Sequence, residues 1–85
     1  MSKIPEVYVV SDSLGETAES VAKATISQFD EDIDVVRVPF IRQAEQIQKV
    51  IEEAAEHGAV VGHALVSAEL RAHFERIAEA NHVKY

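Results

Sequence analysis

The sequence predicts an α/β domain built on a parallel sheet, and three observations lead to this class. Short apolar runs alternate along the chain with longer segments whose apolar residues recur every three or four positions. The short runs are rich in β-branched residues and unbroken by polar ones, as in strands buried on both faces of a parallel sheet. Polar turns separate the two kinds of segment. Strands that alternate with helices in this way form parallel sheets with right-handed crossover connections.

The first apolar run, residues 7–10, predicts the first strand. Ser13 and Glu16 then fit the S-x-x-E capping box, in which each side chain satisfies a free backbone N–H group at the start of a helix. The helix is expected to run to about Phe29, because one stripe of it is apolar or small: Ala18, Val21, Ala22, Thr25, Ile26 and Phe29. A charged turn, residues 30–32, follows it.

Residues 35–38 predict a second strand, which Pro39 ends because proline cannot donate to a strand ladder. The second helix carries a regular apolar stripe, and Gly58 is expected just after its end. That stripe consists of Ala44, Ile47, Val50, Ile51, Ala54 and Ala55. Residues 59–66 predict the third strand and its exit.

Ser67 is expected to cap a third helix, whose apolar stripe is Leu70, Phe74, Ile77 and Ala78. Residues 83–85 then read as the start of a fourth strand. The whole is a βαβαβα(β) order, which predicts a three-layer fold with three to four parallel strands, a flavodoxin-like or Rossmann-like half. Residues 1–85 are expected to form a single domain.

Composition excludes several functional classes. The chain has 85 residues, 47% of them hydrophobic, and a net charge of −7, which argues against binding to nucleic acid or an anionic membrane. It contains no cysteine, so a disulfide scaffold and a thiolate zinc site are excluded. No stretch has the length or hydropathy of a membrane span or signal peptide, so a cytoplasmic protein is expected.

Ligands of open parallel sheets bind beyond the carboxyl ends of the strands. The turn after the first strand is the richest segment predicted to lie there, with three hydroxyls, two carboxylates and one glycine. It supplies the candidate ligand-binding residues Ser11, Asp12, Ser13, Gly15, Glu16 and Thr17. Such a turn can hold a phosphate-like or polar ligand, or it can be a capping box in a solvated turn. It has neither the GxxxxGK[ST] nor the GxGxxG pattern.

Three further residues are weaker candidates. His63, near the end of the third strand, is either an acid/base group or a hydrogen-bonded core residue. Arg42 and Arg71 are expected in the first turn of a helix, where a cation is unfavourable, so each either faces an anion or is solvated. The four histidines are spaced too widely for the usual metal-ligand patterns, and no metal site is predicted.

Residues 7–29, VYVVSDSLGETAESVAKATISQF, resemble the opening of the pyruvate, phosphate dikinase regulatory protein family. Two later segments agree in order and spacing: residues 38–40, and residues 65–66 with 69–71. The SDSxGETAE pattern with the downstream SQF is the most specific part. At residues 62–64, Gly-His-Ala stands where the family is expected to have bulkier residues, which leaves the role of that strand end open.

The resemblance implies an ADP-dependent serine/threonine kinase, and a phosphate-dependent pyrophosphorylase that reverses the modification. Its partner would be pyruvate, phosphate dikinase or phosphoenolpyruvate synthase, and its cofactors ADP and phosphate. The family's phosphate loop, of the form G-x-S-R-x-x-K-[ST], has no counterpart in these 85 residues. The chain is therefore expected to be an N-terminal part, with no catalytic residue and no cofactor of its own.

Two other hypotheses come from the residues alone. One is a small flavodoxin-like module that holds phosphate or flavin mononucleotide on the hydroxyl-rich turn. The other is an interaction domain that self-associates through an exposed sheet edge.

Overall fold

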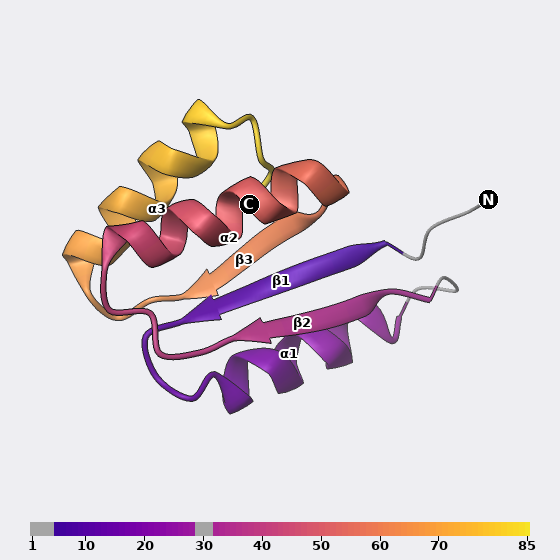
Figure 1. Ribbon diagram of the computed structural model, residues 1–85. Helices are drawn as coiled ribbons and strands as arrows, with labels where there is room; N and C mark the ends of the chain where they lie inside the picture. The colour runs from indigo at the N-terminus through magenta and orange to yellow at the C-terminus, as the bar shows by residue number, and fades with distance from the viewer. Residues whose placement is uncertain (1–4, 29–31) are drawn as a thin grey trace.

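The computed structural model describes residues 5–28 and 32–85. Strands and helices alternate along it (Figure 1), in the order β1 (Glu6–Ser11), α1 (Glu16–Ile26), β2 (Asp34–Val38), α2 (Ala44–His57), β3 (Val60–Ala64) and α3 (Ala68–Ala80). The predicted α/β class and element order are confirmed. The predicted helix end at Phe29 and most of the charged turn at residues 30–32 lie outside the described residues.

The three strands form one parallel sheet in the order β2-β1-β3 (Figure 1). Tyr8 of β1 lies opposite Val36 of β2 and Val61 of β3. The first strand of the chain is therefore the central one, with a neighbour on each side. This position accounts for its unbroken apolar run, because both faces of a central strand in a parallel sheet are covered by helices.

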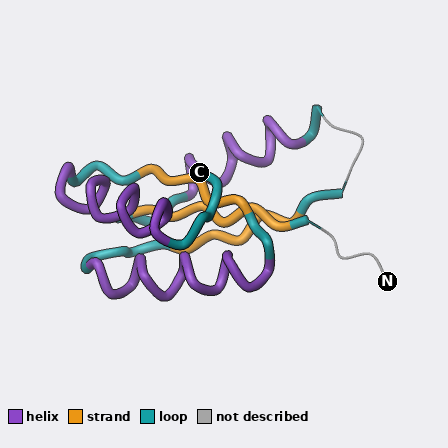
Figure 2. The backbone as a smooth tube through the Cα atoms, turned by 90° about the horizontal axis from the view of Figure 1, so that it is seen from above, coloured by secondary structure: helices purple, strands orange, loops and turns teal. Residues whose placement is uncertain are grey.

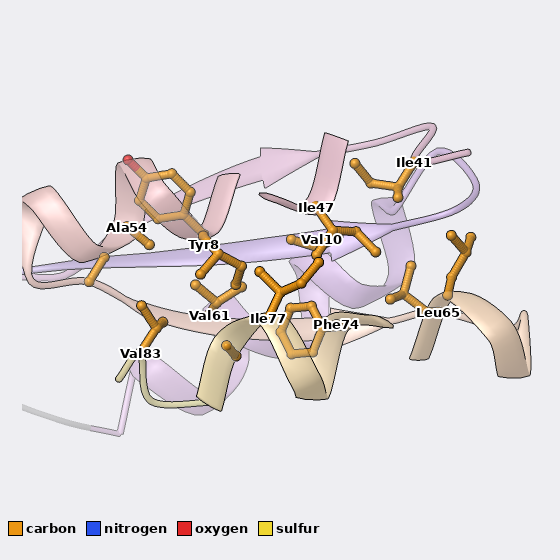
Figure 3. Packing of buried hydrophobic residues seen from close by; sticks show 14 residues of the cluster. Tyr8, Val10, Ile41, Ile47, Ala54, Val61, Leu65, Phe74, Ile77 and Val83 are labelled. Atoms are coloured by element: carbon orange, nitrogen blue, oxygen red, sulfur yellow. The ribbon is translucent and has the colours of Figure 1, made fainter. Parts of the chain in front are cut away.

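The main hydrophobic core lies between the sheet and two of the helices. Figure 2 shows α2 and α3 on one side of the sheet and α1 on the other. Tyr8, Val10 and Val61 project from the strands toward α2 and α3, where they join Ile51 and Phe74, each fully buried (Figure 3). The apolar stripes predicted for the second and third helices thus face the core, except for Ala55 of α2, which is exposed.

The opposite side of the sheet is covered more thinly. No residue of α1 in the described part of the chain is buried, and the Val21 side chain is 60% exposed. Sheet residues of β1 and β2 on this side contact α1, but Val60 and Ala64 of β3 remain exposed. The fold therefore has three layers of unequal depth, with most of its packing on the side of α2 and α3.

Helix ends agree with the prediction for α2 and α3. Gly58 follows α2 in the left-handed conformation, with a φ of 65°, and Ser67 caps α3 by accepting a hydrogen bond from the Leu70 N–H group at 3.2 Å. At the carboxyl end of the chain the prediction was only partly right. Residues 83–85 form no strand, although the Lys84 carbonyl accepts a hydrogen bond from the Val61 N–H group at 2.9 Å.

Candidate functional site

Three loops meet where the strands end: residues 12–15 after β1, 39–43 after β2, and 65–67 after β3. The first two are joined by backbone hydrogen bonds of 2.9 Å, from the Phe40 N–H group to the Ser13 carbonyl and from Ile41 to Ser11. Phe40 takes a positive φ of 59°, a conformation that side-chain-bearing residues rarely adopt. These bonds hold the loops after β1 and β2 together at the carboxyl edge of the sheet.

The Asp12 side chain connects these loops to α3. Its Oδ2 atom accepts hydrogen bonds from the N–H groups of Val66 at 2.9 Å and Ser67 at 3.0 Å. These bonds, that from Ser67 first, lower the pKa of the Asp12 carboxyl below its ordinary value. A carboxylate at this position also interacts favourably with the positive end of the α3 dipole. The carboxylate of Asp12 therefore lies at the N-terminus of α3, where an external anion could otherwise bind.

The two arginine candidates also have internal partners. Arg42 lies before α2, not in its first turn as predicted, because Gln43 is the residue at which α2 is capped. Its guanidinium donates to the Asp12 carbonyl oxygen. Arg71 does lie in the first turn of α3, and donates to the carbonyl oxygens of Leu65 at 3.1 Å and Val66 at 2.7 Å. Both guanidinium groups therefore have carbonyl oxygens of the loops as hydrogen-bond partners.

The predicted capping box at the start of α1 is wrong. Gly15, not Ser13, is the N-cap residue, with a φ of 77°, and no side chain caps the helix. The Ser13 hydroxyl lies instead 3.1 Å from the Ser11 hydroxyl, which also accepts the Ser13 N–H group at 3.1 Å. The local reason is that the short turn bends back over Ser11, which places the Ser13 side chain against the strand end.

This turn borders an open hollow of about 420 Å³ between β1, α1 and the exit of β3. Five of the six candidates from the first turn line it, and Asp12 does not. Its lining residues are Ser11, Ser13, Leu14, Gly15, Glu16, Thr17, Ala18, Ala64 and Val66. Hydroxyl groups and the uncapped start of α1 supply hydrogen-bond donors, while Leu14 and Val66 supply exposed apolar surface, 50% and 81% exposed.

Glycine is required at position 15 for two reasons. Its φ of 77° is in the left-handed region, and a Cβ atom there would lie 3.2 Å from the Ser11 Cβ atom and 3.5 Å from the Arg37 Cγ atom. Arg37 was missed in the sequence analysis. Residue alternation in β2 could have found it, since that pattern places Arg37 on the α1 side of the sheet. Its guanidinium lies 3.9 Å from the Glu19 carboxylate.

His63 faces away from the hollow. Its ring packs against the Phe74 ring on the α3 side of the sheet, with 4.6 Å between centroids, and its Nδ1 atom accepts the Leu65 N–H group at 3.4 Å. Burial lowers the pKa of His63 below its ordinary value. His63 is therefore hydrogen-bonded but only partly buried, and it lies beside the core cluster rather than within it.

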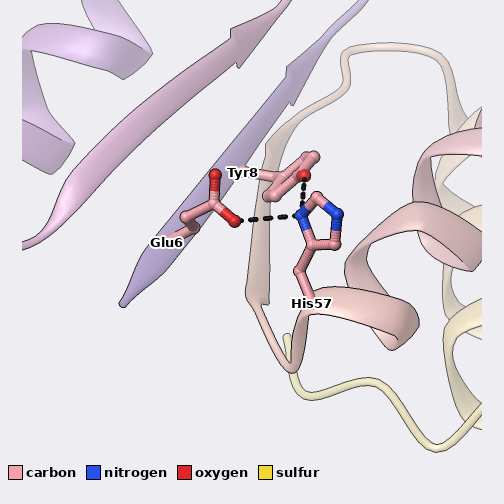
Figure 4. A network of polar contacts seen from close by, with 3 residues as sticks. All are labelled: Glu6, Tyr8 and His57. Carbon is pink, nitrogen blue, oxygen red and sulfur yellow. Dashed lines mark hydrogen bonds and ion pairs between the residues drawn. The ribbon is translucent and has the colours of Figure 1, made fainter. Parts of the chain in front are cut away.

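A separate polar cluster lies at the opposite end of the sheet (Figure 4). The His57 Nδ1 atom, in the last turn of α2, is 3.0 Å from Glu6 Oε1 and 3.1 Å from the Tyr8 hydroxyl oxygen. Burial, followed by the carboxylates of Glu53 and Glu6, raises the pKa of Tyr8 above its ordinary value. This cluster ties the end of α2 to the start of β1, far from the hollow.

Within residues 5–28 and 32–85, no three His, Cys, Asp or Glu side chains are grouped so that they could hold a metal ion. Nor is any helix there both long and apolar enough to span a bilayer.

The fold and its carboxyl-edge hollow define an open α/β domain of the class that binds ligands beyond the carboxyl ends of its strands. The chain belongs to the kinase/pyrophosphorylase family, whose model matches residues 7–85. This assignment agrees with the resemblance of the SDSLGETAE turn, the segment that borders the hollow.

Two relatives of this family are similar to most of the chain. A protein of Carboxydothermus hydrogenoformans is 42% identical over 77 residues, 89% of this chain and 28% of the relative. One of Alkaliphilus oremlandii is 50% identical over 66 residues, 76% of this chain and 24% of the relative. Both are named as predicted pyruvate, phosphate dikinase regulatory proteins. The chain thus spans only 24–28% of the length of these two relatives.

Proposed function

We propose that this chain forms the sheet-containing recognition part of an ADP-dependent serine/threonine kinase and phosphate-dependent pyrophosphorylase. The target would be pyruvate, phosphate dikinase or phosphoenolpyruvate synthase. The observation that carries the proposal is the family match over residues 7–85, together with the hydroxyl-rich hollow formed by its most specific segment. ADP and inorganic phosphate are the implied small-molecule ligands of the whole enzyme, acting in the cytoplasm.

The residues of this chain support a role in recognition rather than in phosphoryl transfer. Phosphoryl transfer needs cations and backbone N–H groups that surround the moving phosphoryl group. Here the two arginines of the carboxyl edge are held by loop carbonyl oxygens, and Glu16 places a negative charge at the start of α1. The hollow offers hydroxyl groups and apolar surface, which suit a peptide segment that carries a serine or threonine. The chain alone is therefore expected to transfer no phosphate.

A chimera tests this assignment. The matched region of the Carboxydothermus relative is replaced by residues 7–85 of this chain, and phosphate transfer from ADP to pyruvate, phosphate dikinase is measured. We expect transfer by the chimera and none by the 85-residue chain. Transfer by the chain alone would show that its chemistry is complete, and a folded but inactive chimera would show that this chain does not serve the kinase.

The hollow is tested in the same chimera. Ser13→Ala and Thr17→Val remove hydroxyl groups that line it, and each is expected to lower the transfer rate roughly tenfold through a raised KM for the protein substrate. Ser27→Ala is the matched control, because its hydroxyl lies at the other end of α1 and donates to the Ala24 carbonyl oxygen. Equal effects of all three substitutions would contradict a role for the hollow in recognition.

A further inference from the structure

Each of the three loops at the carboxyl edge of the sheet (Figure 1) exposes one large apolar side chain. Leu14 after β1 is 50% exposed, Phe40 after β2 is 48% exposed, and Val66 after β3 is 81% exposed. Among residues 5–28 and 32–85 six large apolar side chains are exposed, so half of them lie on these short loops. A single exposed apolar residue is common, but a group of them at one edge is typical of a binding surface.

The fold explains why two of these side chains lie outside the core, but not why they are apolar. Ile41, next to Phe40, and Leu65, next to Val66, are buried in the core (Figure 3). Anchoring of Ile41 and Leu65 leaves their neighbours at the surface, where a polar residue would serve equally well. Phe40 is also unfavourable for its backbone, because glycine or asparagine adopts a φ of 59° with less strain.

Polar contacts hold these loops in one conformation. The Phe40 N–H group donates to a carbonyl oxygen of the loop after β1 at 2.9 Å, and the Arg42 guanidinium lies 5.6 Å from the centroid of the Phe40 ring. The Val66 N–H group donates to the Asp12 carboxylate at 2.9 Å, and the Val66 carbonyl oxygen accepts from Arg71 at 2.7 Å. Because the loops are already ordered, a partner that binds here loses little affinity to ordering them.

We propose that Leu14, Phe40 and Val66 form one docking surface for the target protein, whose bound segment carries apolar residues beside its serine or threonine. The inference rests on the proposed function and extends it. Leu14 and Val66 line the hollow, whereas Phe40 does not, so the surface continues from the hollow to the loop after β2. Aromatic residues and arginine, such as Phe40 and its neighbour Arg42, are enriched at the centres of protein interfaces.

Charge favours this occupant over a second copy of the chain or an anionic membrane. The net charge of −7 opposes the approach of either one. The Glu16 carboxylate lines the hollow beside Leu14 and disfavours an acidic segment there. The target segment is therefore expected to combine a hydroxyl group and apolar side chains with no acidic residue next to them.

Matched variants of the Carboxydothermus chimera test the surface. Phe40→Asn removes the ring but suits the left-handed conformation, and it is expected to raise the KM for pyruvate, phosphate dikinase about tenfold. Val66→Thr keeps the shape of the side chain and should raise this KM about threefold. In both variants kcat should change less than about twofold, because neither residue takes part in phosphoryl transfer. Val21→Thr, at a side chain of α1 that is 60% exposed, is the control and should change neither constant.

The outcomes separate this inference from the proposed function. In an active chimera, KM values of the Phe40 and Val66 variants no higher than that of Val21→Thr would overturn the inference and leave the proposed function intact. If the chimera is inactive, calorimetry of the 85-residue chain with pyruvate, phosphate dikinase tests the surface directly, and the Kd should rise by the same factors. No binding at all would overturn both. Sedimentation of the chain alone as a dimer that Phe40→Asn dissociates would assign the surface to self-association and also overturn the inference.

Discussion

The Asp12 side chain stabilises the fold, although the turn that contains it was predicted to bind a ligand. It lies within the turn that the sequence marks as the candidate ligand-binding segment, yet its carboxylate accepts two N–H groups of the β3–α3 loop. An external anion at the α3 N-terminus would have to displace it. The part of the turn that borders open space is consequently the hollow beside α1, where hydroxyl groups and the Glu16 carboxylate are available.

Asp12→Asn is expected to lower stability at neutral pH and to flatten its dependence on pH in acid. The folded state holds the Asp12 pKa below the ordinary value of 3.8, so the stabilisation is complete above that pH and lost as pH falls through the folded pKa. Urea unfolding between about pH 5 and pH 2 measures it. Glu56→Gln, an exposed residue of α2, is the control. Parallel curves for wild type and Asp12→Asn would contradict this role.

Gly15 and Gly58 both adopt the left-handed conformation, so substitutions at these two positions can be compared directly. Gly58→Ala is expected to cost about 1 kcal/mol, the penalty for a side chain in that conformation, because nothing lies within 4 Å of the added carbon. Gly15→Ala adds a 3.2 Å contact with Ser11 and should cost about 2 kcal/mol. Chemical denaturation of both variants gives the difference. A Gly15→Ala cost no larger than that of Gly58→Ala would mean the turn can shift freely.

At the scale of elements, α1 stands apart from the other two helices. It has no buried residue and no side-chain cap, whereas α2 buries Ile47, Ile51 and Ala54, and the Gln46 side chain accepts a hydrogen bond from the Gln43 N–H group at 3.0 Å. Packing of an apolar face provides most of a helix's stability in a protein. α1, which borders the hollow, is therefore held less firmly by packing in this domain than α2 and α3 are.

Amide hydrogen exchange should reveal this difference directly. Central amides of α1, near Val21, are expected to exchange at least about tenfold faster than those of α2 near Ile51, because α1 can open without exposing core side chains. The measurement needs no substitution, and α3 serves as an internal reference. Equal protection of α1 and α2 would indicate that contacts with β1 and β2 hold α1 more firmly than its burial suggests.

The elements were predictable from sequence to different degrees. Apolar runs and stripes located all three strands and the two core helices, because burial on one or both faces dictates those patterns. The start of α1 was not predictable, because the S-x-x-E pattern of Ser13 and Glu16 does not reveal that the turn folds back on Ser11. The partners of Asp12 and Arg42 were also hidden, because they lie on loops brought together by the sheet and separated along the chain.

For the whole molecule, stability is concentrated on one side of the sheet. Phe74 is fully buried and its ring packs against those of His63 and Tyr85. Phe74→Ala should therefore cost about 3–5 kcal/mol, a large share of the roughly 4–13 kcal/mol available to a chain of this size. Phe40→Ala, at a side chain 48% exposed, should cost well under half as much. Urea midpoints compare the two, and similar losses would contradict a one-sided core.

The central place of the first strand also bears on how the protein acquires its fold during synthesis. β1 is synthesised before both of its partner strands, and β3, its partner on one side, is made only after two helices and another strand. Until Val61 can reach Tyr8, the apolar β1 has an open edge and little cover, a state that invites aggregation or binding by a chaperone. Slowing translation just before β3 should prolong that exposure, and slowing it just after β3 should not.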